Sequence, residues 1–218
     1  MSKIAVLGTG NVGDTIGSKL IELGHTVVMG SRTQNNEKAM AFTAKHNGRA
    51  LAGTFEEAAA YGEIIFNCTK GINSIDALKM AGDNNLKDKI IVDIANPLNF
   101  SGGMPPSLTF SNTNSLGEEI QKTFPSAKVV KALNTMWCGL MVNPDMLNNG
   151  DHTTFICGND TNAKEKVKEI LRSFGWVDKN ILDLGDITSS RGTEMYLAMW
   201  IRVMGIMNTG NFNIKIVS

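Results

Sequence analysis

The chain has 218 residues, with 21 lysine and arginine residues against 21 aspartate and glutamate residues, and 42% apolar residues. This balance gives no net field that would attract nucleic acid or an anionic membrane, so we expect neither as a partner. The length allows one domain with an appendage, and a core of that size needs no disulfide or structural metal.

We expect a cytoplasmic protein. The strand pattern begins at residue 3, which leaves no signal peptide, and the apolar stretch 195–207 is too short to cross a bilayer. The three cysteines are odd in number and lack a C-x-x-C spacing: Cys68, Cys138 and Cys157. That pattern argues against a disulfide framework and against a zinc site.

Through the first 150 residues, short apolar runs alternate with amphipathic stretches. Continuous apolar runs predict buried strands at 4–7, 26–29, 50–51, 63–67, 89–94 and 128–132. Apolar residues at helical spacing predict helices at 12–23, 37–46, 55–60, 74–81 and 115–124. This alternation predicts an α/β fold with a Rossmann-type, doubly wound and mainly parallel sheet.

Beyond residue 150 the pattern predicts strands at 153–157 and 177–183, a helix after an N-cap at Asp160, a methionine-rich helix at 194–206 and a strand-like tail at 213–217. We expect a dinucleotide-binding Rossmann domain at residues 1–150, with a smaller C-terminal α/β extension at 151–218 packed on it. The apolar surface of the extension suggests a homodimer. The long polar loop at 96–114 is typical of a functional segment.

A glycine motif lies between the first predicted strand and the first predicted helix. Gly8 suits the tight turn, Gly10 allows the backbone to approach a pyrophosphate, and Gly13 permits close packing of helix on strand. The free N–H groups at the start of the helix then face the phosphates. Because the expected strand and helix flank the motif, it predicts a dinucleotide site.

The end of the second predicted strand favours NADP(H) over NAD(H). An NAD site places a carboxylate there for the ribose 2′-hydroxyl, but this chain has none between Glu22 and Glu37. Arg32 instead offers a planar guanidinium for a 2′-phosphate, and the hydroxyls of Ser31 and Thr33 add donors.

The chain resembles the NADPH-dependent coenzyme F420 reductase family, which is itself similar to the cytosolic reductase domain of the STEAP metalloreductases. The resemblance covers nearly the whole chain. It is carried by VLGTGNVGDTIGSKLIELGHTVVMGSR, VDIANPL, VVKALNT, TTFICGND, FGW and DLGDITSSRGTEM.

This resemblance implies roles for particular residues. The pyrophosphate would contact Thr9, Gly10, Asn11 and Val12. The 2′-phosphate would contact Ser31 and Arg32. The nicotinamide end would be lined by Thr69, Ala95, Asn96, Asn134 and Thr135. The small-molecule acceptor implied by the resemblance is F420, a flavin or another planar compound.

Hydride transfer needs two rings held at reacting distance and water excluded, so we expect no catalytic side chain. The sequence contains no Ser-His-Asp or Cys-His candidate, and Cys68 suits a packing role. Asp183 and Asp186 suit turn or cap roles rather than metal binding. Arg191 is open to two roles, contact with a phosphate or an acceptor anion, or capping of the preceding loop.

Two other functions remain open. The first is a redox sensor or subunit that binds NADP without turnover. The second is a pyrroline-5-carboxylate reductase or short hydroxyacid dehydrogenase, which begins with a similar domain. Those enzymes continue with a longer all-helical domain, whereas strand patterns continue here, so this function ranks lower.

Overall fold

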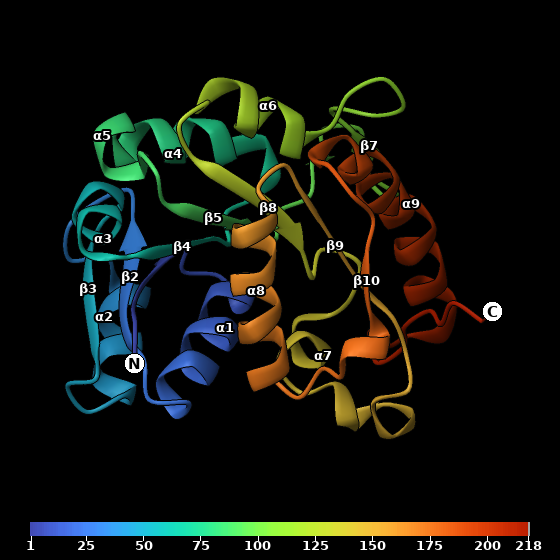
Figure 1. Ribbon diagram of the computed structural model, residues 1–218, viewed down its shortest axis with the longest axis horizontal. Helices are drawn as coiled ribbons and strands as arrows, with labels where there is room; N and C mark the ends of the chain where they lie inside the picture. The colour runs from blue at the N-terminus through green and yellow to red at the C-terminus, as the bar shows by residue number, and fades with distance from the viewer. Residues whose placement is uncertain (218) are drawn as a thin grey trace.

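The computed structural model describes residues 1–217 and has a central β-sheet between two layers of helices (Figure 1). The sheet contains eight strands in the order β10-β9-β8-β5-β4-β1-β2-β3. Their bounds are β1 Lys3–Leu7, β2 Thr26–Ser31, β3 Ala50–Thr54, β4 Ile64–Asn67, β5 Ile90–Asp93, β8 Lys128–Ala132, β9 Thr154–Gly158 and β10 Ile181–Asp183. Neighbouring strands are parallel except β8 and β9, which are antiparallel. The predicted Rossmann-type sheet is confirmed.

Helices cover both faces of the sheet. One face packs against α1 Asn11–Glu22, α2 Glu37–Lys45, α7 Cys138–Val142 and α8 Thr161–Ser173. The other face packs against α3 Phe55–Tyr61, α4 Ser74–Ala81, α5 Asp83–Leu86 and α6 Leu116–Thr123. Along β1, Ile4 and Val6 point to the first layer, and Ala5 and Leu7 to the second. Because both faces are covered, the strand is a continuous apolar run rather than an alternating one.

The C-terminal residues extend the same sheet through β9 and β10, and the long helix α9, Ser190–Met207, follows before the tail. The division of the chain at residue 150 stays a prediction. The predicted N-cap of α8 is confirmed, since Asp160 Oδ1 accepts a hydrogen bond from Ala163 N at 2.7 Å. The loop at 96–114 contains a short antiparallel pair, β6 Leu98–Asn99 and β7 Ser107–Leu108.

Two strand predictions in this part need correction. Only β10 forms within 177–183, because 178–180 make a 3-10 turn first. The strand predicted at 213–217 is wrong. The tail meets the chain at Thr153, which donates its N–H to Ile214 O at 2.9 Å and accepts at Oγ1 from Ile216 N at 3.0 Å. β8 and β10 already flank β9 on both sides, so a further strand has no edge there.

Gly13→Ala tests the packing of α1 on β1. A Cβ at Gly13 would lie 2.0 Å from Gly8 O, so the substitution is expected to lower the free energy of unfolding by at least about 2 kcal/mol. Gly192→Ala is the matched control, because a Cβ on that residue of α9 meets nothing within 4 Å. Urea denaturation of both variants measures the difference, and equal stabilities would contradict the packing role of Gly13.

Candidate functional site

A groove crosses the carboxyl ends of the parallel strands and consists of two hollows. We call them the β2 hollow, about 510 Å³ beside β1 and β2, and the β5 hollow, about 460 Å³ beside β5 and β8. Four residues after β4 line both hollows and therefore join them: Cys68, Thr69, Lys70 and Asn73. The order of the sheet reverses between β1 and β4, which is where doubly wound sheets bind ligands.

The glycine segment lines the β2 hollow. Gly8 has a φ of +118°, and its N–H donates to Gly30 O at 3.0 Å. A Cβ at Gly8 would lie 2.6 Å from Cys68 O, whereas a Cβ at Gly10 would meet open space. Gly10 is the N-cap of α1 and supplies no side-chain acceptor, so the first N–H groups of the helix remain available to an anion.

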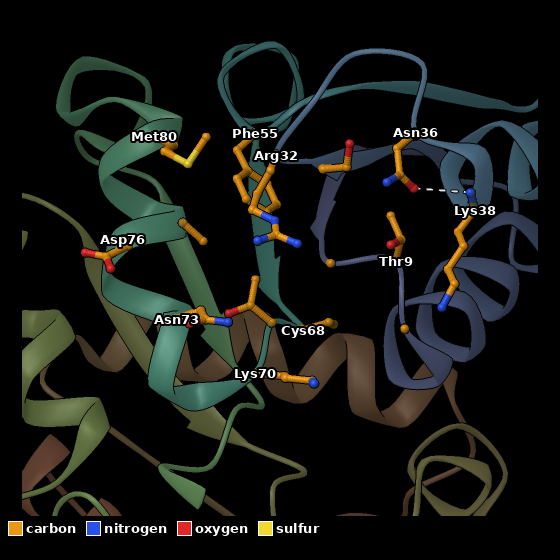
Figure 2. Close-up of a pocket in the computed structure, with 15 residues that line it drawn as sticks. Thr9, Arg32, Asn36, Lys38, Phe55, Cys68, Lys70, Asn73, Asp76 and Met80 are labelled. Carbon is orange, nitrogen blue, oxygen red and sulfur yellow. Dashed lines mark hydrogen bonds between the residues drawn. The ribbon is translucent and has the colours of Figure 1, made fainter. Parts of the chain in front are cut away.

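Cations line the β2 hollow near the end of β2. Arg32 is exposed, and its guanidinium points into the hollow (Figure 2). Lys38, in the first turn of α2, also lines the hollow, and neither side chain has a hydrogen bond or ion pair with residues 1–217. The Ser31 hydroxyl lies beside Arg32 but donates to Thr33 O at 2.5 Å. The acidic lining residue, Asp76, comes from α4 on the other wall.

The β5 hollow is mainly apolar. Its walls include Val12, Ile72, Ile94, Leu98, Phe100, Met136, Met141 and Leu197. Two amides connect the loops after β5 and β8: Asn96 Nδ2 donates to Asn134 O, and Asn134 Nδ2 donates to Asn96 Oδ1, each at 2.8 Å. Lys70 is the charged lining residue of this hollow. The arrangement offers an apolar space with a few fixed polar atoms, which is typical of a site for a ring compound.

A buried ammonium group lies behind the wall of the β5 hollow. Lys131 of β8 is 1% exposed, and its Nζ lies 2.7 Å from Asp93 Oδ2, 2.7 Å from Glu194 Oε1 and 2.6 Å from Ala95 O. Burial alone would lower the pKa of this ammonium, but the adjoining carboxylates of Asp93 and Glu194 outweigh burial and raise the pKa. Lys131 is therefore charged at neutral pH.

On one side the cluster reaches two helices. Glu194 of α9 accepts the backbone N–H of Leu116 at 2.8 Å and of Gly117 at 3.0 Å, both at the start of α6. These N–H groups have no partner within their own helix, so the carboxylate satisfies them and benefits from the positive end of the helix dipole. Glu194 thus holds α6, α9 and β8 together.

On the other side the cluster reaches the groove. Asp93 Oδ1 accepts from Asn67 Nδ2 at 2.8 Å and from Ala95 N at 3.2 Å. Asn67 Oδ1 in turn accepts from Thr69 Oγ1 at 2.7 Å. Thr69 lines both hollows and Ala95 lines the β5 hollow. The buried charges are therefore one or two hydrogen bonds away from the groove.

The structure brings most residues of the predicted site to this groove. Gly8, Thr9, Gly10, Ser31 and Arg32 line the β2 hollow, Thr69 lines both hollows, and Val12, Ala95, Asn96 and Asn134 line the β5 hollow. Asn11 lines a smaller adjoining hollow of about 290 Å³ together with Thr9 and Gly10.

Three residues of the predicted site do not line these hollows: Gly13, Thr33 and Thr135. Gly13 is buried against the carbonyl oxygen of Gly8. Thr33 contributes its carbonyl oxygen, which accepts the hydrogen bond from the Ser31 hydroxyl. Thr135 is 1% exposed, and its Oγ1 has no hydrogen-bond partner within the described chain.

Sequence reasoning missed several lining residues, namely Asn36, Lys38, Phe55, Lys70, Asn73 and Met80, and it missed the Lys131 cluster. These residues come from the start of α2, from α3, from the turn after β4 and from α4, whose positions relative to one another depend on the folded sheet. The signal for the cluster was a lysine inside the apolar run VVKAL, because a charge in a buried strand requires a partner.

The remaining candidate groups have structural roles. Burial, followed by the charge of Asp93, raises the pKa of the Cys68 thiol above its ordinary range, so no thiolate forms at neutral pH. Asp183 Oδ1 accepts from Gly185 N at 2.9 Å and Asp186 Oδ1 from Thr188 N at 3.0 Å, so the predicted turn roles are confirmed.

Arg191 fills neither role considered for it, because it forms a two-pronged pair with Glu118 at 2.8 and 2.5 Å. Among residues 1–217, no three His, Cys, Asp or Glu side chains gather as a metal site would require. Every helix in the same range is too short or too polar to cross a lipid bilayer.

Comparison with known proteins identifies relatives. Residues 3–97 match the sequence profile of the family described as NADP oxidoreductase, coenzyme F420-dependent. A crystal structure from Arthrobacter sp. FB24, of a candidate F420-dependent NADP reductase, is 48% identical over 100% of both chains, with a TM-score of 0.94.

Two curated metalloreductases are more distant relatives. STEAP3 of Rattus norvegicus is 28% identical over 203 residues, which are 88% of this chain and 36% of the rat protein. STEAP2 of Homo sapiens is 25% identical over 198 residues, which are 88% of this chain and 35% of the human protein. The chain thus spans about a third of the length of these relatives.

Lys131→Met tests the energetic weight of the buried cluster. It is expected to lower the free energy of unfolding by about 3–5 kcal/mol, because the two buried carboxylates lose their cation. Lys128→Met on the same strand is the control: its ammonium is 40% exposed and 3.6 Å from Asp160, so we expect a loss of about 0–1 kcal/mol. Urea denaturation at neutral pH compares the two, and equal losses would refute a dominant role for the cluster.

Proposed function

From the premise that this chain belongs to the family of coenzyme F420-dependent NADP oxidoreductases, we propose that it transfers a hydride between NADP(H), bound along the groove, and a planar acceptor in the β5 hollow. The acceptor is F420, a flavin or a similar ring compound. The single observation that carries the proposal is the continuity of the two hollows through Thr69 and its neighbours. A dinucleotide needs such a continuous path from its adenosine to its nicotinamide.

The residues fit the nucleotide at its phosphates. In this proposal the pyrophosphate rests on the amide end of α1, next to Gly10, where a Cβ would project into open space. The 2′-phosphate meets Arg32, whose guanidinium has no partner in the described residues, and Lys38 contributes a second positive charge. These two cations attract the 2′-phosphate, whereas the carboxylate of an NAD site would repel it.

The nicotinamide lies in the β5 hollow in this proposal, near Thr69, Ala95 and Asn134. When bound, NADP(H) supplies the hydride chemistry itself, so the chain has to orient the rings and exclude water. Apolar side chains in the wall of the hollow, such as Leu197 and Met141, exclude water. The paired amides of Asn96 and Asn134 fix the loops after β5 and β8, and fixed loops help to orient the rings.

The alternative is a redox sensor or subunit that binds NADP without turnover. Among the described residues, no carboxylate or histidine lines the β5 hollow, and this agrees with both functions because hydride transfer requires neither. The β5 hollow favours an enzyme, since at about 460 Å³ it has room for more than one ring. Turnover of an offered acceptor distinguishes the two functions.

We expect the chain to oxidise NADPH when a suitable acceptor is present, and stopped-flow absorbance of the nicotinamide measures this with FMN, FAD, a quinone and F420 in turn. Gly10→Val is the negative control, because a Cβ at this residue meets no atom within 4 Å and the side chain would project into the space for the pyrophosphate. Tight NADPH binding with no oxidation by any acceptor would favour the sensor. No binding would remove both functions.

Arg32→Ala tests the preference for the 2′-phosphate. It is expected to weaken NADPH binding by about 1–3 kcal/mol, through loss of a charge-assisted contact, and to change NADH binding little. Arg49→Ala is the matched control, since Arg49 is exposed and does not line the groove. Isothermal titration calorimetry with both nucleotides gives the answer, and equal losses for NADPH and NADH would contradict the assignment of Arg32.

A further inference from the structure

We infer that the buried cluster of Asp93, Lys131 and Glu194 carries one net negative charge and favours the oxidised, cationic nicotinamide over the reduced ring in the β5 hollow. The inference rests on the proposed function, because it requires NADP(H) in the groove. It assigns these three residues a role in setting the redox balance of the bound nucleotide, beyond their role in holding the fold.

Both carboxylates of the cluster are ionised, as their hydrogen bonds require. Asp93 accepts from the Lys131 ammonium, from the Asn67 amide and from Ala95 N. Every one of these partners is a donor, so a proton on Asp93 would face a donor and break a contact.

The same reasoning holds for Glu194. It accepts from the Lys131 ammonium and from the two backbone N–H groups of Leu116 and Gly117, which are again all donors. One ammonium and two carboxylates leave a net charge of one unit, negative, and each side chain is at most 1% exposed. Solvent therefore screens this charge little.

Of the two carboxylates, Asp93 lies nearer the groove, and the Lys131 ammonium also reaches the groove wall at Ala95 O, so it is the net charge of the cluster that acts on the β5 hollow. Asp93 contacts the backbone of Ala95, which lines the β5 hollow, and reaches Thr69 through Asn67. The α6 amide end offsets part of the charge of Glu194, whereas Asp93 faces the groove through neutral groups. The thiol of Cys68, which lines both hollows, has its pKa raised first by burial and next by the charge of Asp93, so the charge of Asp93 acts on a group where the hollows meet.

A fixed negative charge acts differently on the two forms of the nucleotide. When NADPH gives up its hydride, the C4–H bond breaks, the hydrogen and both electrons pass to the acceptor, and the neutral ring becomes a cation. The cluster attracts the cation and not the neutral ring. It therefore lowers the free energy of the bound oxidised form and shifts the equilibrium on the protein towards bound NADP⁺, while the overall equilibrium between the free reactants stays the same.

The test is the ratio of the dissociation constants of NADP⁺ and NADPH, measured by calorimetry on the full chain. Asp93→Asn removes the nearer of the two carboxylate charges and should raise the ratio about tenfold, the effect of one unit charge acting over roughly 12 Å at an effective dielectric constant of about 20. Glu194→Gln should change the ratio in the same direction by a smaller factor. A purely structural role would weaken both nucleotides equally and leave the ratio unchanged.

Glu118→Gln is the matched control. It removes the carboxylate that joins α6 to α9 through Arg191 at the surface, where solvent screens the charge, so the ratio should hold within about twofold. Circular dichroism establishes that each variant is folded.

Several outcomes decide the matter. An unchanged ratio in a folded Asp93→Asn or Glu194→Gln variant would overturn the inference. If neither variant folds, Lys70→Met decides, because it removes the cation that lines the β5 hollow, and a preference of that variant for NADPH of about tenfold or more would contradict a field that favours the oxidised ring. If the wild-type chain binds neither nucleotide, the proposed function itself fails, and that result is distinct from an unchanged ratio.

Discussion

The burial of one ammonium group constrains how a strand and two helices of this fold pack together. A lone charge in a protein interior costs several kcal/mol, so Lys131 requires carboxylates at the same point. One comes from β5 and the other from α9, and the second also takes the amide end of α6. Satisfying one charge therefore fixes where α9 lies on the sheet. Leu197, one turn beyond Glu194, then becomes part of the wall of the β5 hollow.

The groove divides its chemistry between its two ends. The β2 hollow has exposed cations and a free helix end, which suit phosphates in contact with water. The β5 hollow has apolar walls, which suit flat rings and exclude water. Thr69 connects the two, and it is hydrogen-bonded to Asn67 and Ser74. These hydrogen bonds hold Thr69 in place, so its position does not depend on a bound ligand.

The elements predicted well are those that local pattern determines. The apolar run of β1, the helical spacing of α1 and the glycines between them act over a few residues, so the sequence alone places them. The tail at 213–217 has an equally strand-like composition, but it forms no strand because β9 has no free edge. That outcome depends on the partners of β9, which local composition does not contain.

The candidate site shows the same contrast. Gly10 and Arg32 were predicted because their motif fixes their place relative to one strand and one helix. The Lys131 cluster was not predicted, because its members come from β5, β8 and α9 and meet only when the sheet order is known. Lys38 carries no distinguishing signal, since an exposed lysine early in a helix is common. Its position matters only because α2 begins beside the groove.

The reversed direction of β9 determines which turns of the C-terminal region lie near the groove and which lie far from it. Because β9 runs against β8, its carboxyl end lies at the edge of the sheet opposite the groove. The carboxylate of Asp160 caps the N-terminus of α8 at this edge, so it occupies the place that an external anion would take. Insertions in this turn would lengthen a remote edge and leave the nucleotide path intact. An insertion of equal length after β8 would displace Asn134, so evolutionary variation in length should accumulate at the first position and be rare at the second.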